Sequence, residues 1–135
     1  TATAGDWGAA SAGDYGTATA GDRGAASAGD WGTATAGDRG VASAGDNGNA
    51  SAGDNGNASA GDYGRASAGI GGIASAGDGG TIMIRYIDDR LRLRAGYIGE
   101  DGLLPGVSYR LDDDGNFIRA EEGEAVIKSH PELCQ

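Results

Sequence analysis

Residues 1–16 read TATAGDWGAASAGDYG and residues 17–32 read TATAGDRGAASAGDWG, so the chain opens on a unit of eight residues that recurs. Ten such octads fill residues 1–80 without an insertion or a deletion. Recurrence at a fixed period is typical of a solenoid, in which each unit buries one face against its neighbours. We therefore expect residues 1–80 to form a stack of repeats.

The octad itself predicts a short strand followed by a turn. Positions two and four are Ala in every octad, whereas position one is Thr, Ala, Val, Asn, Arg or Ile. Because a strand alternates its side chains between two faces, the alanines are predicted to point inward and positions one and three outward. At positions five to eight, Gly-Asp-x-Gly predicts a turn whose glycines take positive φ and whose Asp accepts hydrogen bonds from N–H groups two residues on.

Two octads are needed to close one coil, because a single octad supplies only one strand and one reversal. Position three alternates between Thr (Thr3, Thr19, Thr35) and Ser (Ser11, Ser27, Ser43), which gives a chemical period of 16. The predicted fold is all-β, a parallel two-sheet β-solenoid with 16 residues per coil and five coils. Its core would consist of Ala methyl groups, which leave no room for larger side chains.

Residues 81–120 predict a C-terminal β-hairpin cap. In Thr81-Ile82-Met83-Ile84 the inward alanines have become isoleucines, which would plug the end of the stack and cover a sheet edge. Residues 121–135 are acidic and then polar, and we expect a loosely ordered tail. The strands expected in the cap are Thr81–Ile87, Arg90–Ile98 (with Leu91, Leu93 and Ala95 on one face and arginines on the other), Val107–Leu111 and Asn116–Ala120, with turns at Asp88-Asp89 and at Asp112 to Gly115.

Composition excludes several classes of function. The chain has 135 residues, 28 of them Gly, with 6% aromatic residues and a net charge of −10. So few large side chains cannot build an ordinary enzyme core over most of the chain. With 10 basic against 20 acidic residues, nucleic acid is not an expected partner, and no apolar run is long enough to span a membrane.

We identify no signal peptide, and the start at Thr1 in mid-pattern suggests that upstream sequence has been removed. Localisation stays open.

No catalytic, cofactor or metal site is predicted. His130 is the only His and lies beside Pro131 without a nucleophile or metal partner, and Cys134 cannot form an internal disulfide. The Asp pairs and triplets of the cap are better explained as hairpin turns. The glycine-rich stretches recur too regularly for a phosphate-binding loop and lack its Lys. We therefore expect a protein that is not an enzyme and holds no cofactor.

The octads and the cap together resemble the repeat region and C-terminal domain of bacterial ice nucleation proteins. The resemblance rests on the G-T-A-T-A-G octads and on Arg85-Tyr86, Arg90 to Arg94, Gly99-Glu100-Asp101-Gly102 and Tyr109. It implies a water-ordering role for Thr-x-Thr rows and an extracellular or cell-surface location. The family also carries a tyrosine row thought to mediate pairing, but Asp stands at that position in nine of ten octads, so this role does not carry over.

Three sets of outward residues are candidate sites. The Thr pairs would lie on one flat face that could order water, although Thr is also simply a good strand residue. The Asp residues would form a row on each edge, for which we favour turn capping over a row of cations. Position seven would carry stacked side chains on both edges, which either stiffen the turns or contact another molecule. The ice-binding candidates are Thr1, Thr3, Thr17, Thr19, Thr33 and Thr35, and the assembly candidates are Trp7, Tyr15, Arg23, Trp31, Arg39 and Tyr63.

The sequence favours a structural rod that self-assembles into a fibre or a dimer, with ice binding through the Thr face as the alternative. The cap would protect one end, whereas the coil that begins at Thr1 shows no capping sequence. Either further repeats precede that coil, or another molecule stacks on it. The expected partner is thus a second copy, stacked end to end or side by side, or ice.

Overall fold

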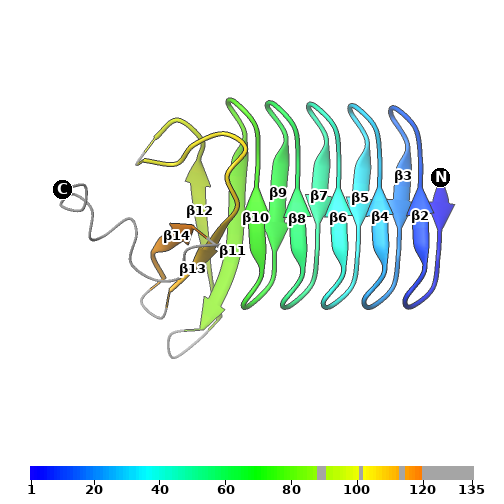
Figure 1. Ribbon diagram of the computed structural model, residues 1–135, viewed down its shortest axis with the longest axis horizontal. Coiled ribbons are helices and arrows are strands. Elements are labelled where there is room, and N and C mark those ends of the chain that lie inside the picture. Colours follow the sequence, from blue (N-terminus) through cyan, green and yellow to red (C-terminus); the bar gives the residue numbers. More distant parts are fainter. Residues whose placement is uncertain (88–90, 101, 113–114, 120–135) are drawn as a thin grey trace.

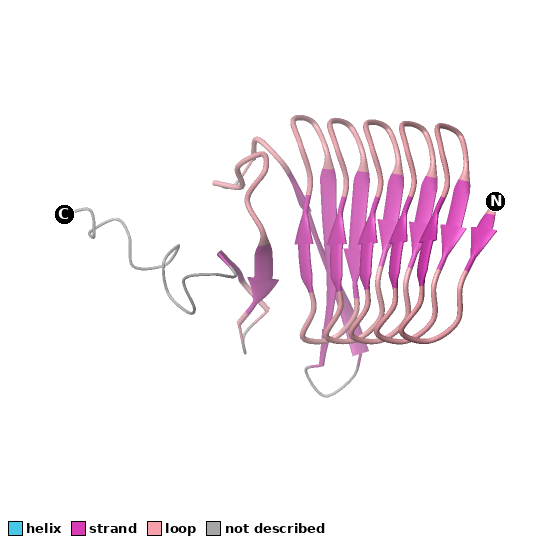
Figure 2. Ribbon diagram, turned by 45° about the vertical axis from the view of Figure 1, so that its right-hand side comes forward, coloured by secondary structure: helices cyan, strands magenta, loops and turns pink. Residues whose placement is uncertain are grey.

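The chain winds into a rod of flat coils that a small β cap closes at its C-terminal end (Figure 1). This computed structural model describes residues 1–87, 91–100, 102–112 and 115–119. All regular elements in these ranges are strands, and the turns line up along the two long edges of the rod (Figure 2). The predicted all-β solenoid with 16 residues per coil is confirmed.

Each coil contributes one strand to each of two sheets. Within the repeats, every strand pairs in parallel with the strand 16 residues away, as in Ala18↔Ala34 and Ala34↔Ala50. The first sheet contains β1 (Ala2–Thr3), β3 (Thr17–Thr19), β5 (Thr33–Thr35), β7 (Asn49–Ser51), β9 (Arg65–Ala68), β11 (Thr81–Ile87) and β12 (Leu91–Tyr97). The second contains β2 (Ala9–Ser11), β4 (Ala25–Ser27), β6 (Val41–Ser43), β8 (Asn57–Ser59), β10 (Ile73–Ser75), β13 (Tyr109–Leu111) and β14 (Phe117–Arg119).

Alanine fills the space between the two sheets, as the invariant positions predict. Ala18, Ala34 and Ala42 are fully buried, and the other inward alanines from the second coil onward are also in the core. One buried methyl group contributes only about 0.8 kcal/mol, so the hydrogen bonds between coils must share the stabilisation. The rod is therefore held by a continuous backbone ladder around a thin apolar core.

The turns differ from the prediction in which residue takes positive φ. Gly8 N–H donates to the Gly5 carbonyl over 3.0 Å, and Trp7 has φ +65°, the pattern of a type II turn. Position seven is thus left-handed in every octad, whereas the glycines at positions five and eight are not. Those glycines serve close approach instead: a Cβ on Gly40 would lie 2.8 Å from the Gly24 carbonyl oxygen of the preceding coil.

The cap begins inside the first sheet. The inward residues of β11, Ile82 and Ile84, pair with Ala66 and Ala68 of β9 and are fully buried, so they plug the alanine column as predicted. The antiparallel pairing of β11 with β12 and of β13 with β14 confirms two hairpins. β11 has the predicted bounds, whereas β12, β13 and β14 are each two residues shorter than predicted. The turn predicted at Asp88-Asp89 lies outside the described residues.

The face of β12 that carries Leu93 and Ala95 points to solvent. Alternation with the arginines is confirmed, but Leu93 pairs with Arg85 on the outer face and is 56% exposed. The large apolar residues that close the rod are instead Ile98, Leu103, Tyr109 and Ile118. Tyr109 is fully buried, pairs with Ala74 of the last coil, and accepts a hydrogen bond from the Leu104 N–H at its hydroxyl.

Candidate functional sites

The Thr face lies on the outside of the first sheet. Register places Thr3 beside Thr19 and Thr19 beside Thr35, with Thr1, Thr17 and Thr33 in a parallel column. All six predicted Thr residues therefore share one surface, exposed in the first coil and half-buried by the third. The columns continue as Asn49/Ser51 and Arg65/Ser67, so the Thr lattice covers three coils. This is a flat, regular array of hydroxyl and methyl groups.

The Asp residues at position six form two hydrogen-bonded ladders, one along each edge. The Asp22 N–H donates to Asp6 Oδ1 over 3.0 Å, and Asp38 repeats this contact with Asp22 over 3.1 Å. The same bond joins successive Asp residues on the opposite edge. We expected each Asp to accept a bond two residues on; the acceptor role is right, but the donor lies one coil away. Each carboxylate therefore links its own turn to the turn of the next coil by a hydrogen bond.

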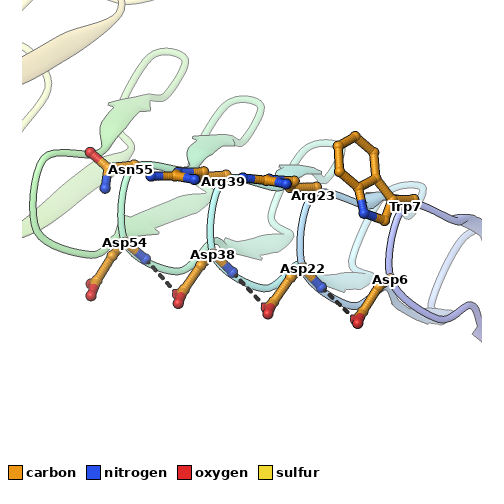
Figure 3. Close-up of a pocket in the computed structure, with 8 residues that line it drawn as sticks. All are labelled: Asp6, Trp7, Asp22, Arg23, Asp38, Arg39, Asp54 and Asn55. Carbon is orange, nitrogen blue, oxygen red and sulfur yellow. Dashed lines mark hydrogen bonds between the residues drawn. The ribbon is translucent and has the colours of Figure 1, made fainter.

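One edge, which we call the Trp–Arg edge, comprises the turns at residues 5–8, 21–24, 37–40, 53–56 and 69–72. Its position-seven row reads Trp7, Arg23, Arg39, Asn55 and Gly71, of which Figure 3 draws the first four. The guanidinium carbon of Arg23 lies 4.9 Å from the centre of the Trp7 ring, which is a cation–π contact. The stacking predicted for this pair is confirmed.

The other edge, the Tyr–Trp edge, comprises the turns at residues 13–16, 29–32, 45–48, 61–64 and 77–80. The rings of Tyr15 and Trp31 stack with centroids 6.2 Å apart and an angle of 8° between their planes. The predicted stack is therefore present, and both rings remain largely in solvent, with Tyr15 77% and Trp31 57% exposed. Tyr63, further along the same row, is 70% exposed and lies beyond Asn47.

All eight non-glycine residues at position seven have a left-handed backbone, with φ between 58° and 65°. For an L residue this conformation costs roughly 1–2 kcal/mol, and only Gly, Asn and Asp adopt it readily. Asn47, Asn55, Gly71 and Gly79 suit it, whereas the Trp, Tyr and Arg residues do not. The bulky residues are thus placed where the backbone disfavours them and where their side chains face solvent.

The two edges differ in charge. The Trp–Arg edge carries four carboxylates and two guanidiniums, whereas the Tyr–Trp edge carries five carboxylates and no Lys, Arg or His. A groove of about 480 Å³ runs along the Trp–Arg edge, with its eight lining residues drawn from the Asp row and the position-seven row. Figure 3 shows these as two parallel rows, the carboxylates on one side and the position-seven side chains on the other.

A patch of apolar side chains that the sequence prediction missed lies on the outer face of the β11–β12 hairpin. Ile87 is 62% exposed and Tyr97 57% exposed, and Leu93 belongs to the same face. The alternation of apolar residues in β12 gave the signal, but alternation by itself does not say which face is buried.

A metal-binding cluster and a membrane-spanning helix are both absent from the described residues. No group of three or more His, Cys, Asp or Glu side chains in these ranges is placed to hold a metal ion. Nor do the described residues include a helix of the length and apolarity that crossing a membrane requires. His130 and Cys134 lie outside the ranges that the structure describes.

Comparison with models of known protein families, with curated proteins and with solved structures gave no match. The octads and the cap thus remain a resemblance to the ice nucleation proteins, and what the structure shows is a repeat β-solenoid of five coils.

Proposed function

We propose that the protein is a non-enzymatic structural rod that self-associates through its turn edges. One observation carries the proposal: bulky side chains occupy left-handed backbone positions along both edges and remain exposed. Strained residues tend to persist where they serve a function, and rows of exposed aromatic rings are typical of contact surfaces. Glycine would relieve the strain at every one of these positions, as at Gly71 and Gly79.

A variant with stripped edges tests this function. It replaces each bulky position-seven residue by Gly, the residue that position tolerates best: Trp7→Gly, Tyr15→Gly, Arg23→Gly, Trp31→Gly, Arg39→Gly and Tyr63→Gly. We expect sedimentation velocity to show association of the natural chain and none of the variant, while the variant melts at an equal or higher temperature. Equal association of the two chains would refute the proposal.

Ice binding through the Thr face is the second candidate. The observation that favours it is the in-register pairing Thr3↔Thr19 and Thr19↔Thr35, which repeats each hydroxyl at the strand spacing of about 4.8 Å. Under this function the chain would shape ice crystals, and Thr19→Lys would abolish the shaping. The same substitution would leave edge contacts untouched, so the two functions are separable.

A further inference from the structure

The two rows that line the groove of the Trp–Arg edge are chemically complementary to each other. In the first four coils, the position-seven residues Trp7, Arg23, Arg39 and Asn55 each carry a side-chain N–H donor. In the same four coils, the neighbouring row consists of Asp6, Asp22, Asp38 and Asp54, whose carboxylates only accept hydrogen bonds; the fifth turn has Ile70 and Gly71 in their place. Both rows advance by one coil, about 4.8 Å, per residue. The edge is therefore a strip of donors beside a strip of acceptors with the same spacing.

Both rows contain polar groups that have no hydrogen-bond or ion-pair partner within the edge itself. Each carboxylate uses Oδ1 to accept the N–H of the next coil, which leaves Oδ2 without a partner among the described residues. Arg23 contacts the Trp7 ring, and neither Arg23 nor Arg39 forms an ion pair with the Asp row of its own edge within the described part of the chain. Charges of both signs thus face the groove unpaired.

We propose that the Trp–Arg edge is a self-complementary interface, and that its partner is the same edge of a second copy with the two rods parallel. This deepens the proposed self-association and rests on it. The two copies are related by a two-fold axis that lies between the rods and runs parallel to them. This rotation leaves each coil opposite the same coil of the partner, but it reverses the left-to-right order of the two rows. Each donor strip then faces the partner's acceptor strip, and Arg23 and Arg39 meet the partner's Asp22 and Asp38.

The alternative pairings of edges lack this complementarity. In an antiparallel dimer of the same edge, the two-fold axis is perpendicular to the rods. The donor row would then face the partner's donor row, and the carboxylates would face carboxylates. Two Tyr–Trp edges would face each other with five carboxylates each and no cation, which opposes association. The Trp–Arg edge is the one of the two that can satisfy both of its rows with a copy of itself.

The interface is narrow, since four rungs of the edge take part, and the affinity is expected to be weak. Exposed ion pairs contribute roughly 0.2–1 kcal/mol each, and the dimer holds four of them, because each chain supplies two guanidiniums. Removing both guanidiniums from each chain removes all four pairs and should therefore weaken dimerisation by about tenfold or more.

The test compares two double variants of equal net charge by sedimentation velocity, from micromolar to millimolar protein. Arg23→Gln with Arg39→Gln removes the cations of the Trp–Arg edge. The matched control, Arg65→Gln with Arg85→Gln, removes two exposed cations from the outer face of the first sheet. We expect the first variant to dissociate about tenfold more readily than the natural chain and the control to stay within twofold.

Two results would overturn the interface and are distinguishable from each other. If the chain associates but the edge variant behaves like its control, while Tyr15→Ala with Trp31→Ala abolishes association, the interface is wrong and the proposed function stands. If the natural chain stays monomeric throughout, both fail. Thermal melting of each variant accompanies the runs, to show that each variant is folded at the temperature of the experiment.

The orientation of the rods is tested separately with a spin label at Asn55→Cys in a Cys134→Ser chain. In the parallel dimer the two labels lie on facing coils, so one short distance is expected. An antiparallel dimer would separate them by three further coils, about 14 Å, and such a distance would contradict the proposed arrangement.

Discussion

At position seven of each octad the residue type and the backbone conformation are in conflict. Arg39 has φ +61° and Trp31 has φ +61°, although a Cβ disfavours this region. Four octads carry Asn or Gly at this position, which is a sequence signal for positive φ, but our prediction assigned that conformation to the invariant glycines at positions five and eight. They are needed instead where the coils approach each other, which leaves the left-handed position to the residue between them.

Relief of that strain should be measurable in a single substitution. We expect Arg39→Gly to raise the free energy of unfolding by about 0.5–1 kcal/mol, since the gain in backbone conformation exceeds the extra chain entropy that Gly loses. The matched control is Arg65→Gly in β9, where Gly should lower stability by a similar amount. Urea unfolding of both variants checks this, and a loss of stability in Arg39→Gly would contradict it.

The Asp ladder makes a second prediction for single residues. Asp38 accepts the Asp54 N–H over 3.0 Å, so Asp38→Ala should cost about 1 kcal/mol, whereas Asp38→Asn retains the acceptor and should cost less. Asp78 ends its row, and its carboxylate accepts no bond from a further coil within the described residues. Asp78→Ala is therefore the control and should be close to neutral. Equal losses at Asp38 and Asp78 in thermal melts would show that the ladder does not stabilise the rod.

At the scale of the coil, the close spacing of the two sheets limits the size of the side chains that fit in the core. Ala34 is fully buried between neighbouring alanines of the same column. Ala34→Leu should destabilise the rod by about 1–3 kcal/mol or unfold it locally, because the methylenes have no space. Asn57→Leu, at an exposed outward position of β8, should cost under about 0.5 kcal/mol. Unfolding by urea discriminates the two, and tolerance of Leu at position 34 would argue against a packed alanine core.

The repeat could be predicted from sequence in detail, and the cap only in outline. Invariant Ala at two alternating positions identifies the buried face, and the Thr/Ser alternation gives the coil length. In the cap, Leu93 alternates with arginines, but a shift by one residue would exchange the faces. Pairing of Thr81 with Tyr97 sets the register that turns Leu93 outward. That register joins residues up to 16 positions apart, so the alternation within one strand does not reveal it.

The sequence predicts which residues make up the candidate sites and two of the contacts between them, but not the hydrogen bonds of the Asp rows. The period of 16 brings Trp7 to Arg23 and Tyr15 to Trp31, and both contacts are present. The period does not reveal that the Asp side chains bond one coil onward, because local rules for Asp concern its immediate neighbours. It also does not reveal the groove that the two rows of the Trp–Arg edge enclose.

At the scale of the whole molecule, the Thr face and the edges are separate surfaces of one rod. Thr19→Lys changes the outer face of the first sheet and touches neither edge. We therefore expect this variant to associate like the natural chain, within twofold in the dissociation constant. Parallel sedimentation and ice-shaping assays on the same sample check this. Loss of association would place the contact on the Thr face.

The central claim is that this rod associates with itself, and sedimentation velocity over a concentration series tests it most directly. The account predicts that the sedimenting mass rises with concentration from the 13.3 kDa of one chain toward twice that value. A mass that stays at one chain from micromolar to millimolar protein would contradict it.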